Sequence, residues 1–103
     1  MGRNQKKNVK EKEKQLFQKY GVQGFNKPVP TPNHKTKSHL VLIKHDGRPK
    51  VIRFGQQGVT GSPKMKGESP EYQKRRLAFK RRHAKNIRKG PTSAAYWADK
   101  VKW

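Results

Sequence analysis

The clearest hydrophobic pattern in the chain lies in its middle. Two strand-like runs, LVLI at residues 40–43 and KVIRF at residues 50–54, flank the dipeptide Asp46-Gly47. An Asp-Gly pair between two such runs is typical of a tight two-residue hairpin turn. The pattern therefore predicts a β-hairpin over residues 38–55.

A narrower apolar pattern covers residues 4–20, where apolar side chains recur at helical spacing and Gly21 can end the helix. The opposite side of this helix alternates Lys and Glu, so the helix would be marginal on its own. We therefore expect its apolar stripe to dock on a partner, together with the last aromatic residue of the chain. The predicted partner-docking residues are Val9, Leu16, Phe17, Tyr20 and Trp103.

Residues 24–37 follow this helix and contain three prolines within five positions. Proline lacks a backbone N–H and favours an extended chain. This segment is interpreted as an arm or linker that does not belong to a core. Residues 1–37 also hold too little apolar surface to order themselves.

Two helices are predicted after the hairpin. A Gly- and Pro-rich loop ends in Ser69-Pro70-Glu71, which provides an N-cap, a first-turn proline and a first-turn carboxylate. The helix that starts there stops at Gly90-Pro91, and a short helix follows. The predicted boundaries are 1–37 for the N-terminal helix and proline-rich arm and 38–103 for a small domain, which comprises hairpin 38–55, loop 56–69, helix 70–89 and short helix 93–102.

These patterns predict a small α+β fold. A central β-hairpin is packed by a basic C-terminal helix and a short terminal helix, and an N-terminal helix and arm extend from it. Trp97 is interpreted as core, because two tryptophans supply much of the apolar mass of so polar a chain. The core is expected to be single and to contain Leu42, Ile52, Phe54, Phe79 and Trp97.

Composition adds a strong charge to this picture. The chain has 103 residues with 27 Lys and Arg against 6 Asp and Glu, a formal net charge of +21, and only 29% hydrophobic residues. That length allows one small domain. Self-repulsion at such a charge opposes compactness, and a polyanion relieves it. Nucleic acid is the commonest polyanion and therefore the favoured partner, although acidic protein surfaces and anionic membranes remain open on charge alone.

The charge is most one-sided between residues 74 and 89, which contain no carboxylate. A solvated helix face normally mixes both signs, and like charges three or four residues apart destabilise a helix. Contact with phosphates turns this repulsion into attraction. No base-reading motif accompanies the charges, so we expect binding to the backbone without sequence preference, with DNA favoured. The predicted nucleic-acid-binding residues are Lys74, Arg75, Arg81, Arg82, Lys85, Arg88 and Lys89.

Residue patterns for other chemistry are missing from the sequence. The absence of cysteine excludes disulfides and thiolate sites, and the four histidines lack the close spacing of metal ligands. The loop GQQGVTGSPK lacks the ending of a phosphate-binding P-loop. We predict no catalytic residues, metal, cofactor or small-molecule substrate. We also predict no membrane-spanning segment, since no apolar run approaches about 18 residues, and we expect no membrane partner.

Four segments between residues 37 and 103 resemble a family of small, very basic proteins of tailed phages and some large DNA viruses. They are KSHLVLIK, KVIRFGQQGV, FKRRHAKNI and SAAYWADKVKW. The family has no assigned activity, so the resemblance implies viral provenance rather than a mechanism. It favours a structural component of the virion that contacts nucleic acid or acidic surfaces of other virion proteins, present in the host cytoplasm before assembly. The alternative is a free DNA- or RNA-binding protein, including a ribosome-associated one, acting in the host cell.

Overall fold

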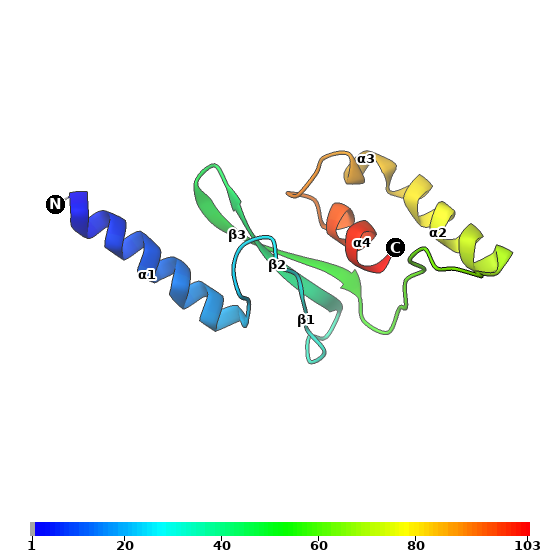
Figure 1. Ribbon diagram of the computed structural model, residues 1–103, viewed down its shortest axis with the longest axis horizontal. Coiled ribbons are helices and arrows are strands. Elements are labelled where there is room, and N and C mark those ends of the chain that lie inside the picture. The colour runs from blue at the N-terminus through cyan, green and yellow to red at the C-terminus, as the bar shows by residue number, and fades with distance from the viewer. Residues whose placement is uncertain (1) are drawn as a thin grey trace.

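The computed structural model describes residues 2–103, with side chains described from residue 10 onward. Figure 1 shows α1 on one side of a central sheet and α2, α3 and α4 on the other. A three-stranded sheet flanked by helices is a small α+β fold, which confirms the predicted class. The elements are α1 (Gly2–Tyr20), β1 (Val29–Pro30), β2 (Lys37–His45), β3 (Arg48–Gln56), α2 (Pro70–Arg82), α3 (Ala84–Ile87) and α4 (Ala94–Lys102).

The predicted hairpin is present as β2 and β3. Its strands pair in antiparallel register from Lys37 opposite Gln56 to His45 opposite Arg48. Asp46 and Gly47 connect them with φ values of 52° and 75°. Two consecutive positive φ values produce the turn that matches the twist of the flanking strands. The local sequence was therefore sufficient to locate this element.

The central strand β2 is buried on both faces, so the described side chains form two hydrophobic clusters. Side chains alternate between the two faces of a strand, which sends Val41 and Ile43 to one side and Leu40 and Leu42 to the other. The expected single core is therefore wrong in one respect, because Leu42 does not lie with Phe54 and Trp97. We name these clusters the C-terminal core (Val41, Ile43, Ile52, Phe54, Trp97 and Ala98) and the N-terminal core (Val22, Leu40 and Leu42).

The proline-rich arm belongs to the sheet, which corrects its interpretation as a linker outside any core. Val29 pairs with Leu40, and Pro30 pairs with His39, so that β1 forms an edge strand. Proline is tolerated there because an edge strand leaves half of its backbone groups unpaired. The side-chain amide of Gln57 fixes the following turn by donating to the carbonyl oxygen of Thr31 at 2.6 Å.

The apolar stripe of α1 packs on the hairpin of the same chain. Leu16, Phe17 and Tyr20 lie against the N-terminal core, and the ring of Phe17 meets that of Phe25 edge-on at 5.1 Å. These three residues were predicted to dock on a partner, whereas in the structure they pack against Val22 and against Leu40 and Leu42 of β2. The side chain of Val9, the fourth residue of the predicted stripe, lies outside the described residues.

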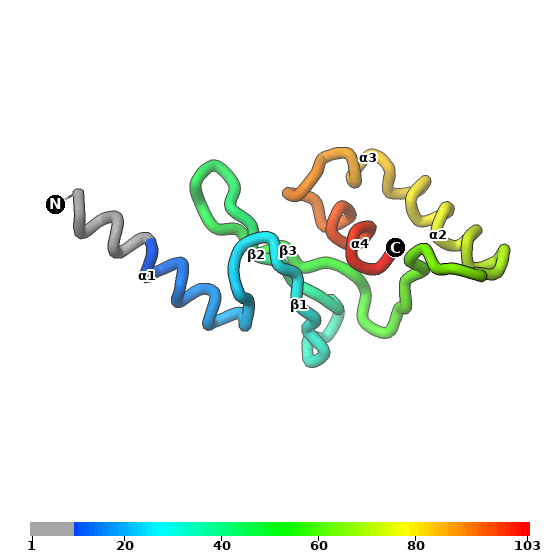
Figure 2. Tube along the Cα trace, in the orientation of Figure 1, coloured from blue at the N-terminus to red at the C-terminus, as the bar shows by residue number. Residues whose placement is uncertain are grey.

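The predicted helix over residues 70–89 is divided into α2 and α3. His83, with φ −107° and ψ 10°, leaves the helical conformation between them, and the change of direction lets α3 run beside α4. The predicted start is correct, since the Ser69 side chain accepts a hydrogen bond from the backbone N–H of Tyr72 at 3.2 Å. In Figure 2 the C-terminal end lies beside the segment that follows β3.

Candidate nucleic-acid interface

Two cations of the basic helix α2 form ion pairs within the protein. Arg76 is almost fully buried and binds Glu68 with two hydrogen bonds, 2.7 Å from Nη1 to Oε2 and 2.6 Å from Nη2 to Oε1. The hydrogen bond from Arg76 is the main reason that the pKa of Glu68 falls from its ordinary 4.5 to about 2. This pair ties the loop before α2 to the helix.

The second pair connects α2 to α4. Lys80 Nζ lies 2.5 Å from Asp99 Oδ1, and both side chains are partly buried. Lys80 and Arg76 are the two cations between residues 74 and 82 that were not predicted to contact nucleic acid. They face the rest of the protein, which separates them from the remaining cations of the helix.

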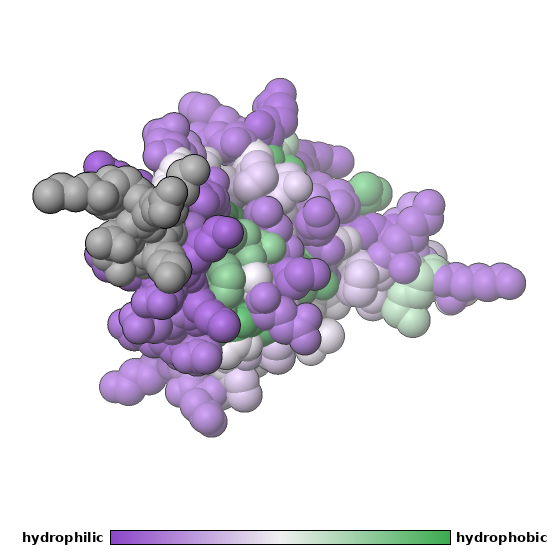
Figure 3. Space-filling view, turned by 60° about the vertical axis from the view of Figure 1, so that its left-hand side comes forward, coloured by the Kyte–Doolittle hydropathy of each residue, from purple (hydrophilic) through white to green (hydrophobic). Residues whose placement is uncertain are grey.

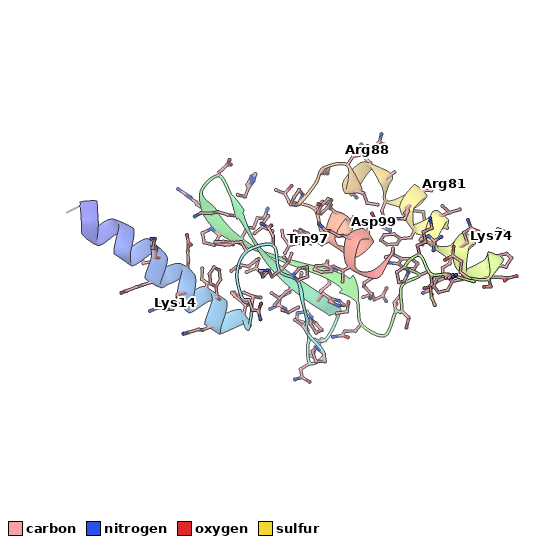
Figure 4. All side chains as sticks on the ribbon, in the orientation of Figure 1. Lys14, Lys74, Arg81, Arg88, Trp97 and Asp99 are labelled. Atoms are coloured by element: carbon pink, nitrogen blue, oxygen red, sulfur yellow. The ribbon has the colours of Figure 1, made fainter. Side chains whose placement is uncertain are left out.

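All seven residues predicted to bind nucleic acid are exposed, and we call them the basic face: Lys74, Arg75, Arg81, Arg82, Lys85, Arg88 and Lys89. Among the described side chains, four ion pairs are formed and none includes a residue of this face. Lys74, Arg81 and Arg88 follow one another along α2 and α3 in Figure 4, whereas Trp97 and Asp99 lie on α4. The structure therefore presents a row of exposed cations along α2 and α3 to solvent.

Among the described side chains, the acidic residues form no ion pair with this row. Glu13 pairs with Lys44 at 2.9 Å between α1 and β2, and Asp46 lies in the hairpin turn. Glu71 occupies the first turn of α2, where a carboxylate interacts favourably with the helix N-terminus. Hydrophilic side chains cover most of the surface seen in Figure 3.

Trp103, predicted to contact a partner, belongs to a stack of side chains beside the basic face. Its ring lies 4.5 Å from that of Phe79 at an angle of 5°, and the guanidinium carbon of Arg75 lies 4.9 Å from its centroid. Phe79 in turn contacts His83, with ring centroids 4.5 Å apart. The ring of Trp103 is therefore in contact with two residues of α2 in the same chain. The predicted core position of Trp97 is confirmed, since it is 2% exposed and its indole N–H donates to the carbonyl oxygen of Pro91 at 2.8 Å.

A hollow of about 330 Å³ lies next to this stack, and we call it the C-terminal hollow. It opens between α2, the end of α4 and the end of β3. Three cations contribute to its wall, two from the basic face and Lys102 from α4. Its lining residues are Gly55, Gln56, Val59, Arg75, Phe79, Arg82, His83, Ala98, Lys102 and Trp103.

Lys102 was not singled out by the sequence analysis, because it looks like one more lysine of a basic terminus. Its ammonium donates to Ser38 Oγ at 3.1 Å and to the carbonyl oxygen of Gln56 at 3.2 Å. Ser38 Oγ lies 2.8 Å from Nδ1 of His39. Burial, followed by the nearby charge of Lys102, lowers the pKa of His39, so the surroundings favour its neutral ring.

Within the described residues, no group of three or more His, Asp or Glu side chains is placed to hold a metal ion. A search of the same residues finds no helix that is long and apolar enough to cross a membrane. No protein-family model, curated protein or solved structure matches the chain.

Proposed function

We propose that this is a non-enzymatic, highly basic viral protein that binds the phosphate backbone of nucleic acid through its basic face. The observation that carries the proposal is the division of charges on α2. The two cations that face inward, Arg76 and Lys80, hold Glu68 and Asp99. The seven cations of the basic face have no such pairing among the described side chains, and a row of unpaired cations attracts phosphates.

Binding is expected to depend little on base sequence. The face consists of long, flexible Lys and Arg side chains on two helices of 13 and 4 residues and on the two residues that follow the second helix. Contacts of this kind position a protein on the backbone and carry no sequence information by themselves. Duplex DNA is the favoured ligand.

The net charge of +21 and the resemblance to small basic viral proteins together support a place in the virion. There the protein would contact the packaged genome, acidic surfaces of other virion proteins, or both. It would pass through the host cytoplasm before assembly. Mass spectrometry of purified particles tests this location.

A second candidate is a free nucleic-acid-binding protein that acts in the host cell on DNA or RNA. The carboxylate-free run from Lys74 to Lys89 favours it equally, because phosphate binding does not require a particle. Absence of the protein from purified particles, combined with its presence on nucleic acid from infected cells, would select this candidate.

The salt dependence of duplex DNA binding tests the interface. The logarithm of the association constant should fall linearly with the logarithm of salt concentration, with a slope of about −0.9 per neutralised phosphate. Replacing four residues of the basic face by Gln should make the slope shallower by up to about 3.6. This face variant carries Lys74→Gln, Arg81→Gln, Lys85→Gln and Arg88→Gln.

A matched control removes four exposed charges from the other side of the molecule. It carries Lys27→Gln, Lys35→Gln, Arg48→Gln and Lys50→Gln, all at exposed positions in or beside the sheet. We expect its slope to stay close to that of the wild type, although its net charge equals that of the face variant. Equal slopes for the two variants would show that total charge, and not this face, determines binding.

A further inference from the structure

The C-terminal hollow combines shape and charge in a way that the outer basic face does not. Its volume of about 330 Å³ lies at the lower end of the roughly 300–1,000 Å³ typical of small-ligand sites. Arg75, Arg82 and Lys102 line it from two different helices, and none of its lining residues has a side-chain carboxylate. The hollow is thus a concave site with positive charge on several sides.

Two glycines, Gly55 and Gly61, leave the space that Lys102 occupies in this wall. A Cβ added at Gly61 would overlap the carbonyl oxygen of Lys102 and lie 2.5 Å from its carbonyl carbon. A Cβ added at Gly55 would overlap Ser38 Oγ and lie 3.0 Å from Lys102 Cδ. A larger residue at position 61 would displace the backbone of Lys102, and one at position 55 would displace Ser38, which accepts a hydrogen bond from the Lys102 ammonium.

The Lys102 ammonium has no carboxylate partner in this position. Two of its three N–H donors are used by Ser38 and Gln56, which leaves one free for a ligand. Burial and then the charge of Arg75 lower the pKa of Lys102, which means that the surroundings disfavour its charged form. An anion placed between these cations would remove this cost.

The anion can be compared with the carboxylate that this protein already binds. Glu68 is paired with one arginine, Arg76, and accepts one further hydrogen bond from the backbone N–H of Met65. Three cations arranged around a hollow favour a ligand with more negative charge and more acceptor oxygens than a carboxylate has. A phosphate monoester carries about −1.5 to −2 charges at neutral pH and three strong acceptor oxygens, whereas a phosphodiester inside a strand carries one charge.

We propose that the C-terminal hollow binds a terminal phosphate monoester of a nucleic-acid strand, with Arg75, Arg82 and Lys102 as its contacts. The inference rests on the proposed nucleic-acid binding and adds a preference for phosphorylated ends. Arg75 and Arg82 directly follow Lys74 and Arg81 in the chain, so the hollow continues the basic face. A strand lying along that face could place its end in the hollow.

The test compares oligonucleotides of one sequence that carry a 5′-phosphate, a 3′-phosphate, or hydroxyl groups at both ends. At fixed ionic strength the full-length protein should bind at least one of the phosphorylated forms about fivefold or more tightly than the hydroxyl form, which corresponds to about 1 kcal/mol. The two phosphorylated forms identify which end is recognised. Arg82→Gln should abolish the preference, and Arg81→Gln should weaken all three oligonucleotides equally and keep the ratio.

Lys102→Gln provides a second variant, and circular dichroism verifies that it is folded. It should also lose the preference for a phosphorylated end. Equal affinity for all three oligonucleotides, with the steep salt dependence intact, would refute phosphate binding in the hollow and leave the proposed role of the basic face unchanged. Loss of salt-dependent binding altogether would instead overturn the proposed function. Tight binding of an acidic peptide at the hollow without any preference for a phosphorylated end would assign the site to a protein carboxylate and refute the inference.

Discussion

Gly61→Ala is the substitution from which we expect the largest effect per atom added. Gly61 is buried in the loop before α2, and the new methyl group would overlap the backbone carbonyl of Lys102. Backbone atoms cannot rotate away as a side chain can, so the end of α4 must move. Overpacking of this kind costs about 1–3 kcal/mol, and we expect the upper end here. For a domain of this size, about 3 kcal/mol corresponds to a melting temperature lowered by about 12–24 °C.

Thermal unfolding followed by circular dichroism measures this effect. Gly24→Ala is the matched control, because a methyl group there meets nothing within 4 Å. It should be neutral or stabilise the protein by up to about 1 kcal/mol, through the reduced freedom of the unfolded chain. If both alanine variants melt at the wild-type temperature, the loop does not support the end of α4, and the geometry of the C-terminal hollow is wrong.

Two further substitutions test the packing and the buried ion pair. Phe54→Ala, in the C-terminal core, should cost about 3–5 kcal/mol in urea unfolding, and Leu42→Ala, in the N-terminal core, about 2–5 kcal/mol. The two losses of stability should add in the double variant if the cores are independent. A strongly non-additive result would support the single core expected from the sequence. Glu68→Gln should weaken the dependence of the free energy of unfolding on pH in the acid range. Because folding lowers the pKa of Glu68 to about 2, its contribution is complete above about pH 4.5 and is lost as the pH falls toward 2. An unchanged acid profile would contradict the pair with Arg76.

The hairpin and the start of α2 could be predicted because their signals are local. The Asp46-Gly47 turn and the Ser69 cap each act within a few residues. The two cores could not be predicted in the same way. Alternation shows that Leu40 and Leu42 share a face, but not what covers it, since that depends on residues far away in the sequence, such as Leu16 and Phe17.

The candidate interface was predictable as a set of residues and not as an arrangement. The carboxylate-free run identified the cations, yet only the fold shows which of them are neutralised. Arg76 and Lys80 are paired because Glu68 and Asp99 reach them from a loop and from α4. The role of Lys102 could not be predicted for a similar reason. It depends on contacts with β2 and β3 that cannot be read from the sequence.

Because β2 is buried on both faces, the position at which the chain is cut determines whether a fragment stays folded. Residue 37, where the sequence placed a domain boundary, is the first residue of β2. A fragment that begins at residue 38 would lose β1 and α1 and so uncover Leu40 and Leu42 together with one edge of the strand. An apolar face beside an unpaired edge favours pairing between molecules and aggregation. Limited proteolysis within the arm would therefore yield precipitating fragments rather than a smaller soluble domain.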